Sequence, residues 1–182
     1  TARCAADTAG DWIVGFGIAG DEKIGAPKDF RWAFDCAREA GLRLTAHAGE
    51  WGGPDSVRDA VRDLEVERIG HGVRAIEDLS LVDELAEKAI VLECCPGSNV
   101  TLGIYQTFRD HPIAELDRRG CKVTISTDDP PFFHTTMARE YEQLHRAFDW
   151  DEGQFRRIAR QSLDAAFCDA DTKARIAKLL EA

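Results

Sequence analysis

The sequence predicts an α/β fold, namely the C-terminal five βα units of a (β/α)8 TIM-type barrel followed by C-terminal helices. Five short apolar runs begin 24 to 32 residues apart, and helical patterns separate them, which suits successive βα crossovers. Unusual polar residues follow most of these runs. That placement favours a barrel over a doubly wound sheet, because a barrel gathers all its strand ends at one mouth.

Each apolar run is expected to form a strand. Most runs lack strict alternation of apolar and polar residues, as expected when helices cover both faces of a parallel sheet. The predicted strands lie at residues 12–18, 42–46, 66–69, 90–94 and 122–126.

Helices are expected wherever apolar residues recur at helical spacing. They cover residues 29–40, 55–64, 77–89 and 112–119 between the strands, and 135–148, 151–167 and 172–180 in the tail. A complete barrel needs eight strands and typically about 250 residues. Residues 1–182 are therefore predicted to be a single domain segment, the C-terminal part of a barrel. Since five strands alone would leave open apolar edges, we expect the N-terminal strands to exist in the native protein.

Composition narrows the class of partner. The 33 acidic and 23 basic residues give a formal charge of −10, which argues against nucleic acid or an anionic membrane and favours a small neutral or cationic molecule. The six cysteines show neither CxxC spacing nor the density of a disulfide scaffold, so a reducing, cytoplasmic location is expected. No apolar run approaches the roughly 20 residues of a membrane helix.

The first candidate site is the segment from His47 to Glu50, directly after the second predicted strand. An imidazole suits Zn²⁺, and a carboxylate beside a metal-activated water can exchange protons with a substrate. A buried, hydrogen-bonded histidine beside an exposed loop glutamate is the structural alternative. The segment alone does not decide between them.

The second candidate is His71, which follows the third predicted strand between Gly70 and Gly72. Glycines on both sides let the backbone bend and let another group approach the imidazole closely. A histidine at the end of the next strand strengthens the prediction of a site there.

The third candidate is the pair Asp128 and Asp129, at the end of the fifth predicted strand and before two prolines. Paired acids beside a core are costly unless they meet a cation or hydrogen-bond donors. One can bind a metal while its neighbour accepts a hydrogen bond from a ligand. A helix N-cap or a solvated turn is the alternative explanation.

Other strand ends carry weaker signals. Gly20 can expose a backbone amide to a ligand, although an ordinary strand-to-loop turn explains it equally well. Residues 95–99 can line the mouth of a barrel, but turn chemistry suffices to explain them. His111 and His145 are predicted to lie at the surface. Zinc deaminases that act on flipped nucleobases carry HxE and PCxxC motifs, and this sequence has neither.

Taken together, four ordered motifs resemble the adenosine deaminase family over essentially the whole chain. They are His47-Ala-Gly-Glu50, Arg68-Ile-Gly-His71-Gly72, Cys95-Pro-Gly-Ser-Asn99 and Ser126-Thr-Asp-Asp129-Pro130. The resemblance implies one Zn²⁺ per complete active site, held by a His-x-His pair on the first barrel strand and by the residues that match His47 and Asp128. The 182 residues contain no His-x-His. This segment alone is therefore expected to bind zinc poorly and to be inactive.

The same resemblance implies hydrolytic deamination of a purine. Zinc would lower the pKa of its bound water, and His71 with Asp128 would help to orient and deprotonate that water for attack on C6. Glu50 would donate a proton to ring N1, and ammonia would leave. Asp129 would share a hydrogen with N7, and the Gly20 amide would meet N3.

Adenosine or deoxyadenosine is the expected substrate, a small purine nucleoside, with adenine or another aminopurine as the alternative. The preference rests on Gly70 and Gly97, where the adenine deaminase branch is expected to carry bulkier or acidic residues. Three other interpretations stay open. They are an amide hydrolase of the same superfamily, a barrel without catalysis, and one fragment of a split enzyme that completes its site by association.

Overall fold

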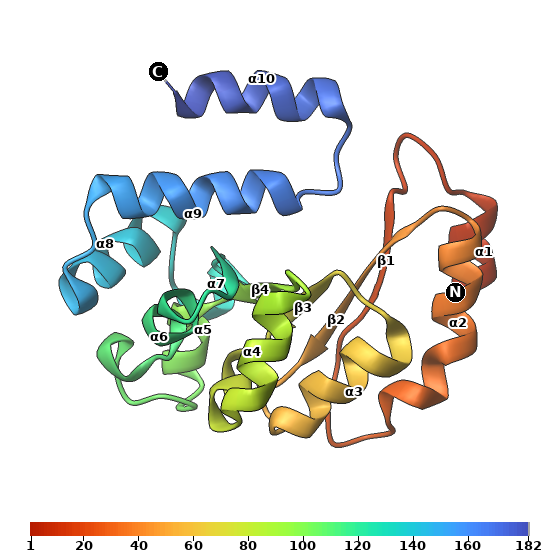
Figure 1. Ribbon diagram of the computed structural model, residues 1–182, viewed down its shortest axis with the longest axis horizontal. Coiled ribbons are helices and arrows are strands. Elements are labelled where there is room, and N and C mark those ends of the chain that lie inside the picture. The colour runs from red at the N-terminus through yellow and green to blue at the C-terminus, as the bar shows by residue number, and fades with distance from the viewer. Residues whose placement is uncertain (182) are drawn as a thin grey trace.

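A single parallel sheet forms the centre of the computed structural model, which describes residues 1–181 (Figure 1). Its five strands are hydrogen-bonded in the order in which they occur along the chain, so each is paired with the next. They are β1 (Gly15–Ile18), β2 (Arg43–Ala48), β3 (Arg68–His71), β4 (Val91–Cys94) and β5 (Lys122–Ile125). All five predicted strands are confirmed.

Helices connect the strands and form the C-terminal tail. The α-helices are α1 (Ala2–Asp7), α2 (Arg31–Glu39), α3 (Pro54–Leu64), α4 (Leu79–Glu87), α5 (Pro96–Thr101), α6 (Ile113–Arg118), α7 (Pro130–Phe133), α8 (Met137–Phe148), α9 (Glu152–Ala165) and α10 (Ala170–Leu180). Short 3-10 helices are η1 (Pro27–Phe30), η2 (Val73–Glu77) and η3 (Phe108–Asp110).

Some boundaries differ from those predicted. The first strand begins at Gly15 and not at Trp12, whose side chain is 94% exposed. The helix expected at 77–89 covers only Leu79–Glu87, because Asp78 caps it by accepting hydrogen bonds from the amides of Ser80 and Leu81, while Glu77 belongs to η2. Residues 96–101 form α5, where only a turn was expected.

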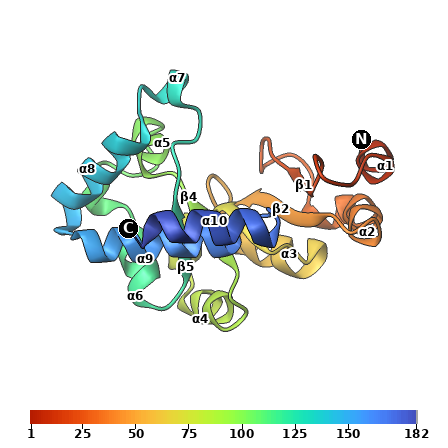
Figure 2. The same cartoon turned by 90° about the horizontal axis from the view of Figure 1, so that it is seen from above.

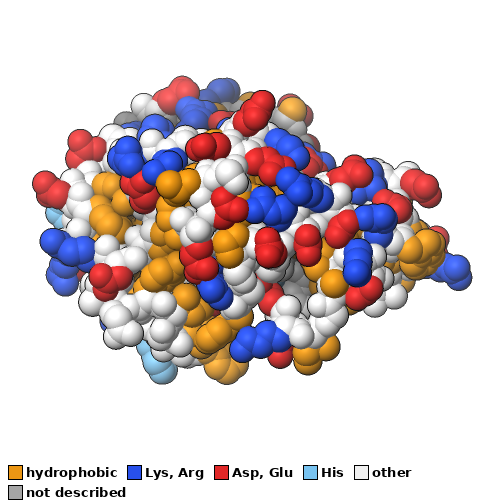
Figure 3. All heavy atoms as spheres, turned by 60° about the horizontal axis from the view of Figure 1, so that its bottom comes forward, with side chains coloured by type: hydrophobic (Ala, Val, Ile, Leu, Met, Phe, Trp, Pro, Cys, Tyr) orange, Lys and Arg blue, Asp and Glu red, His pale blue; other side chains and the backbone are white. Residues whose placement is uncertain are grey.

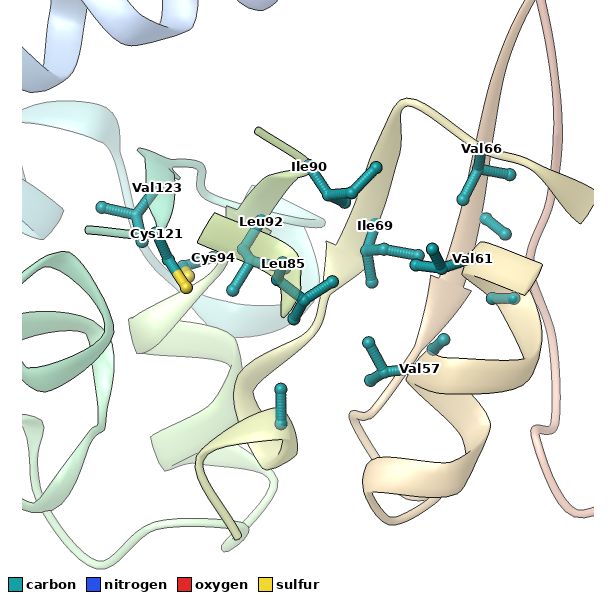
Figure 4. Packing of buried hydrophobic residues seen from close by; sticks show 14 of the residues in the cluster. Val57, Val61, Val66, Ile69, Leu85, Ile90, Leu92, Cys94, Cys121 and Val123 are labelled. Atoms are coloured by element: carbon teal, nitrogen blue, oxygen red, sulfur yellow. The ribbon is translucent and has the colours of Figure 1, made fainter. Parts of the chain in front are cut away.

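The main core lies between the sheet and the helices α3 and α4. Val57 and Val61 of α3 face Ile69 of β3, and Leu85 of α4 faces Leu92 of β4 (Figure 4). Apolar residues that recur at helical spacing make one side of each helix fit the sheet.

The strand β2 shows how the sheet positions polar groups. Leu44, Ala46 and Ala48 are buried, whereas His47, between two of them, is exposed on the opposite face. Successive strand residues point to opposite faces, so a single strand supplies both core and site. In register with the next strand, His47 lies across from Gly70.

The C-terminal tail packs back onto the sheet. The helix α9 contacts β5, and α10 lies alongside α9 (Figures 1 and 2). Between these two helices, Phe167 lies under the guanidinium of Arg68, which is 3.5 Å from its ring centroid. This stacking connects the tail to the start of β3.

The surface carries interspersed charges. Figure 3 shows acidic and basic side chains mixed over the face turned forward, with hydrophobic groups between them. Within residues 1–181, no helix has the length and apolar character needed to cross a membrane.

Candidate active site

Three predicted residues meet where β2, β3 and β5 end. Nε2 of His71 lies 3.6 Å from Oε2 of Glu50 and 3.8 Å from Oδ2 of Asp128. His71 is the last residue of β3, and Glu50 and Asp128 lie in the segments that follow β2 and β5. The parallel sheet brings them together because all its strands end on the same side. The cluster is largely shielded from solvent, with exposed fractions of 13% for Glu50, 2% for His71 and 22% for Asp128.

The backbone of this cluster is strained. His71 has a φ of 63° and Asp128 a φ of 59°, in the left-handed region that side chains other than glycine rarely adopt. Such conformations persist where surrounding structure enforces them, and they concentrate at functional sites. Both strand ends therefore turn sharply so that their side chains point at each other.

His47 joins the cluster through its ring. The His47 and His71 rings lie edge to face with centroids 5.1 Å apart. A Cβ on Gly70 would lie only 2.7 Å from Nδ1 of His47, so this position must be glycine for the imidazole to keep its place. The group that approaches Gly70 and the His71 imidazole closely, as the glycines led us to expect, is thus the ring of His47.

Burial sets the protonation of the two central groups. Burial, together with the nearby carboxylates of Asp128 and Glu22, raises the pKa of Glu50 to about 7. Burial and the neighbouring His47 lower the pKa of His71 to about 4, although the carboxylates of Asp128 and Glu22 act in the opposite direction. Near neutral pH the site therefore combines a carboxyl group that can hold a proton with an uncharged imidazole.

The first turn of α5 forms the wall behind these residues. Ser98 Oγ donates a hydrogen bond of 2.7 Å to Oδ2 of Asp128. Asn99 Nδ2 lies 3.4 Å from Oε1 of Glu50 and 3.3 Å from Nδ1 of His71. Residues 95–99 were expected to be a polar turn, but they begin a buried helix whose side chains contact the site directly.

His111 is also part of this wall, so the prediction that it lies at the surface is wrong. Its side chain is 2% exposed, and its Nε2 lies 3.1 Å from Oδ1 of Asn99. Only the apolar residues Pro112, Ile113 and Ala114 follow His111, and this short run was too weak a signal to predict that the histidine is buried. His145, in contrast, is exposed as predicted.

Glu22 organises the loop that carries Glu50. Its carboxylate accepts backbone hydrogen bonds at 2.8 Å from Gly49, 2.9 Å from Glu50 and 3.0 Å from Gly52. It also accepts one of 2.8 Å from Ser56 Oγ. Successive N–H groups that converge on one anion form a nest, and the negative charge strengthens each bond. Sequence reasoning gave this glutamate no role.

Two predicted substrate contacts lie at the edge of the cluster. Gly20 borders a cavity of about 270 Å³ that Glu22 and His47 also line. Its φ of 137° is one that favours glycine, and open space lies where a Cβ would stand. Asp129 precedes the first residue of α7 with an exposed side chain.

The donor atoms suit a metal such as zinc. Atoms of His71, Cys95 and Asp128 that can act as ligands lie within 4.8 Å of one another, and the His47 ring adjoins His71. Imidazole and carboxylate are ligands that zinc accepts. Burial raises the pKa of the Cys95 thiol far above its usual range, so it stays protonated and is the weakest donor of the group.

Comparison with known proteins agrees with this geometry. The sequence profile described as adenosine deaminase matches residues 1–182. The chain belongs to the adenosine deaminase family. An adenine deaminase of Rhizobium leguminosarum is 49% identical over 179 residues, which are 98% of this chain and 56% of that protein.

Solved structures of family relatives share the fold. An adenine deaminase from Arthrobacter aurescens is 33% identical with a TM-score of 0.89, over 93% of this chain and 52% of that one. An amidohydrolase from Burkholderia ambifaria with bound zinc is 29% identical with a TM-score of 0.88, over 99% of this chain and 52% of that one. The predicted fold, the C-terminal units of a TIM-type barrel, is confirmed. The chain spans about half the length of the relatives it matches.

Proposed function

We propose that the protein hydrolyses adenine to hypoxanthine and ammonia in the cytoplasm, and that this chain supplies the proton donor and part of a zinc site. The cluster of Glu50, His71 and Asp128 carries the proposal. A carboxyl group whose pKa is raised to about 7 can hold a proton near neutral pH and deliver it to a ring nitrogen.

We propose adenine as the substrate in place of adenosine, because several curated relatives, 47 to 49% identical to this chain, are named adenine deaminase. The expectation of adenosine rested on two glycines. A Cβ on Gly70 would crowd Nδ1 of His47, and one on Gly97 would overlap Oε1 of Glu140. Packing alone explains both glycines, so they say nothing about whether a ribose is present. Adenosine remains the alternative substrate.

Each residue of the candidate site has a separate role in the proposed reaction. His47 and Asp128 would hold zinc together with the His-x-His pair that the family resemblance implies, and bound zinc would acidify a water. Glu50 protonates the ring nitrogen beside the reacting carbon and thereby makes that carbon more electrophilic. His71 orients the attacking oxygen by hydrogen bonding. Asp129 and the Gly20 amide are the proposed contacts of purine N7 and N3.

The test uses the full-length protein with its zinc content measured. Hypoxanthine and ammonia released from adenine are compared with inosine and ammonia released from adenosine. We expect about one zinc per chain and a kcat/KM for adenine at least tenfold above that for adenosine, since the purine contacts need no ribose. Glu50→Gln should lower kcat by roughly 10² to 10⁴-fold without loss of zinc.

A matched control is Glu67→Gln. Glu67 pairs with Arg43 near the other ends of the strands, so its loss should leave both kcat and zinc unchanged. Faster turnover of adenosine than of adenine would assign the nucleoside as substrate. Zinc without release of ammonia from either compound would exclude the proposed reaction and favour an amide substrate.

A further inference from the structure

A chain of hydrogen bonds behind the site constrains the protonation of its histidines. It begins at the backbone N–H of Ile113, which donates to Nδ1 of His111 over 3.2 Å. A backbone N–H can only donate, so Nδ1 of His111 is an acceptor and the hydrogen of the neutral ring lies on Nε2. Burial lowers the pKa of His111 to about 3, which keeps the ring neutral at physiological pH.

The next link orients an amide. Nε2 of His111 donates to Oδ1 of Asn99 at 3.1 Å. With Oδ1 on that side, Nδ2 of Asn99 faces Nδ1 of His71 at 3.3 Å and Oε1 of Glu50 at 3.4 Å. An amide nitrogen carries two hydrogens and accepts none, so Nδ1 of His71 must accept. The hydrogen of the neutral His71 ring then lies on Nε2.

We propose that His111 is a positioning residue, which holds His71 through Asn99 in the tautomer with its hydrogen on Nε2. All three side chains are at most 2% exposed, so water does not compete for these hydrogen bonds. Each donor in this series of hydrogen bonds faces an acceptor. Turning over the Asn99 amide, or moving the hydrogen of either histidine ring to its other nitrogen, would place two donors or two acceptors together.

The tautomer determines what His71 can do. Its Nε2 faces the carboxylates of Glu50 and Asp128. Carrying a hydrogen there, His71 would meet the oxygen of a reacting water as a hydrogen-bond donor, and Nε2 could not accept the proton of that water. The family resemblance implied both orientation and deprotonation by His71. The hydrogen-bond chain keeps the first role and removes the second.

The alternative is that His111 only fills the core. Its ring packs edge to face against Tyr105 with centroids 5.1 Å apart, which is a sufficient reason for an aromatic side chain there. If packing were its whole contribution, removing its nitrogens while keeping a ring would leave the tautomer of His71 unchanged.

The test is ¹⁵N NMR of the histidine rings in the full-length protein at about pH 8, where bare and hydrogen-bearing ring nitrogens give separate signals. The signals of His71 are those that disappear in His71→Gln. We expect a bare Nδ1 and a hydrogen on Nε2. His145 is an internal control of the opposite tautomer, because its Nδ1 faces the backbone oxygen of Trp150 at 2.8 Å and must donate.

Two variants interrupt this series of hydrogen bonds at different residues. Asn99→Asp replaces the amide donor with a carboxylate that only accepts, so the hydrogen of His71 should move to Nδ1. His111→Phe keeps a ring but frees the Asn99 amide to turn over, so both tautomers should appear. Each variant should lower kcat by about 10 to 100-fold, as lost support of an active-site histidine does. His145→Gln should change neither the tautomer nor kcat.

A hydrogen on Nδ1 of His71 in the unaltered protein overturns the proposal, and so does an unchanged tautomer of His71 in Asn99→Asp or in His111→Phe. The unaltered protein gives this answer even if a variant does not fold. Only the kcat measurement rests on the proposed function. A protein that shows the expected tautomer but deaminates no purine would support the hydrogen-bond chain and refute the proposed function.

Discussion

Individual carboxylates in this protein hold the backbone of the candidate site in place. Glu22 is the clearest case, because its two oxygens satisfy amide groups of four consecutive residues, 49 to 52, together with the hydroxyl of Ser56. Gly52 packs so closely against this carboxylate that a Cβ there would overlap it. The position of Glu50 therefore depends on a residue 28 positions earlier in the chain.

Glu22→Gln should lower kcat by about 10²-fold, the order of loss that follows when a catalytic group is displaced by about 1 Å. Glutamine has the size of glutamate, but its NH₂ group would face amide N–H groups that need an acceptor. Zinc content should stay at that of the unaltered protein. Ser56→Ala, which removes one donor and keeps the charge, should have a smaller effect on kcat. Equal kcat values for Glu22→Gln and the unaltered protein would contradict a role for this loop.

Gly70→Ala should weaken zinc binding roughly 10 to 100-fold, the range found when the support of a metal ligand is lost. The new methyl group would lie 2.7 Å from Nδ1 of His47 and push the ring aside. The measurement is zinc affinity by competition with a chelator. Gly153→Ala in α9 is the control, since its nearest neighbour is Asp151, away from the site. Unchanged affinity in Gly70→Ala would argue that His47 is not a ligand.

At the scale of elements, α8 and α5 are joined by a buried acid. Glu140 of α8 is fully buried. Its carboxylate accepts a hydrogen bond of 2.9 Å from the amide of Gly97 in α5 and one of 2.6 Å from Thr135 Oγ1. Burial raises the pKa of this carboxyl above its ordinary 4.5, although both hydrogen bonds lower it. Ionisation of Glu140 is thus less favourable in the folded protein than in the unfolded chain.

This pKa shift predicts a pH-dependent difference between the unaltered protein and Glu140→Gln. Below about pH 4.5 the acid is neutral in both folded and unfolded states, so the difference in unfolding free energy is constant. As pH rises above 4.5, the unaltered protein loses stability relative to the variant until the folded-state pKa is passed. Denaturant titrations from about pH 4 to 8 measure this difference. Glu142→Gln, which removes an exposed carboxylate on the same helix that pairs with Arg146, is the matched control.

Sequence patterns predicted the elements whose formation depends mainly on residues close together in the sequence. Strands recur at regular spacing, and His47, Glu50, His71 and Asp128 lie at or shortly after their ends, so a parallel sheet was enough to bring them together. Cys95 to Asn99 was missed as a helix because α5 is only six residues long and begins with proline and glycine. The amide of Gly97 in its first turn donates to Glu140, 43 residues later, and no local pattern indicates that contact.

The supporting residues were missed for the same reason. Glu22 and His111 act through contacts with groups that are distant in sequence, and neither lies immediately after a strand. A glutamate in a turn and a histidine before a proline are most often surface residues. Only the folded chain shows that one gathers a nest of amides and the other is 2% exposed.

At the scale of the whole molecule, charge distinguishes possible purine substrates. The chain has a net charge of −10, and the carboxylates of Glu22, Asp128 and Asp129 lie near the strand ends where the substrate would enter. A neutral purine base is not steered by this field, whereas a nucleotide phosphate is repelled.

Turnover of adenine should therefore be insensitive to salt, with kcat/KM changing less than about twofold between roughly 0.05 and 0.5 M NaCl, over which the screening length falls several-fold. Adenosine 5′-monophosphate should be turned over far more slowly, and its rate should rise with salt because screening weakens the repulsion. Neutral adenosine in the same series separates the effect of a bulky ribose from that of charge. If the nucleotide reacts as fast as adenine at low salt, cationic groups elsewhere in the complete protein must offset the acidic strand ends.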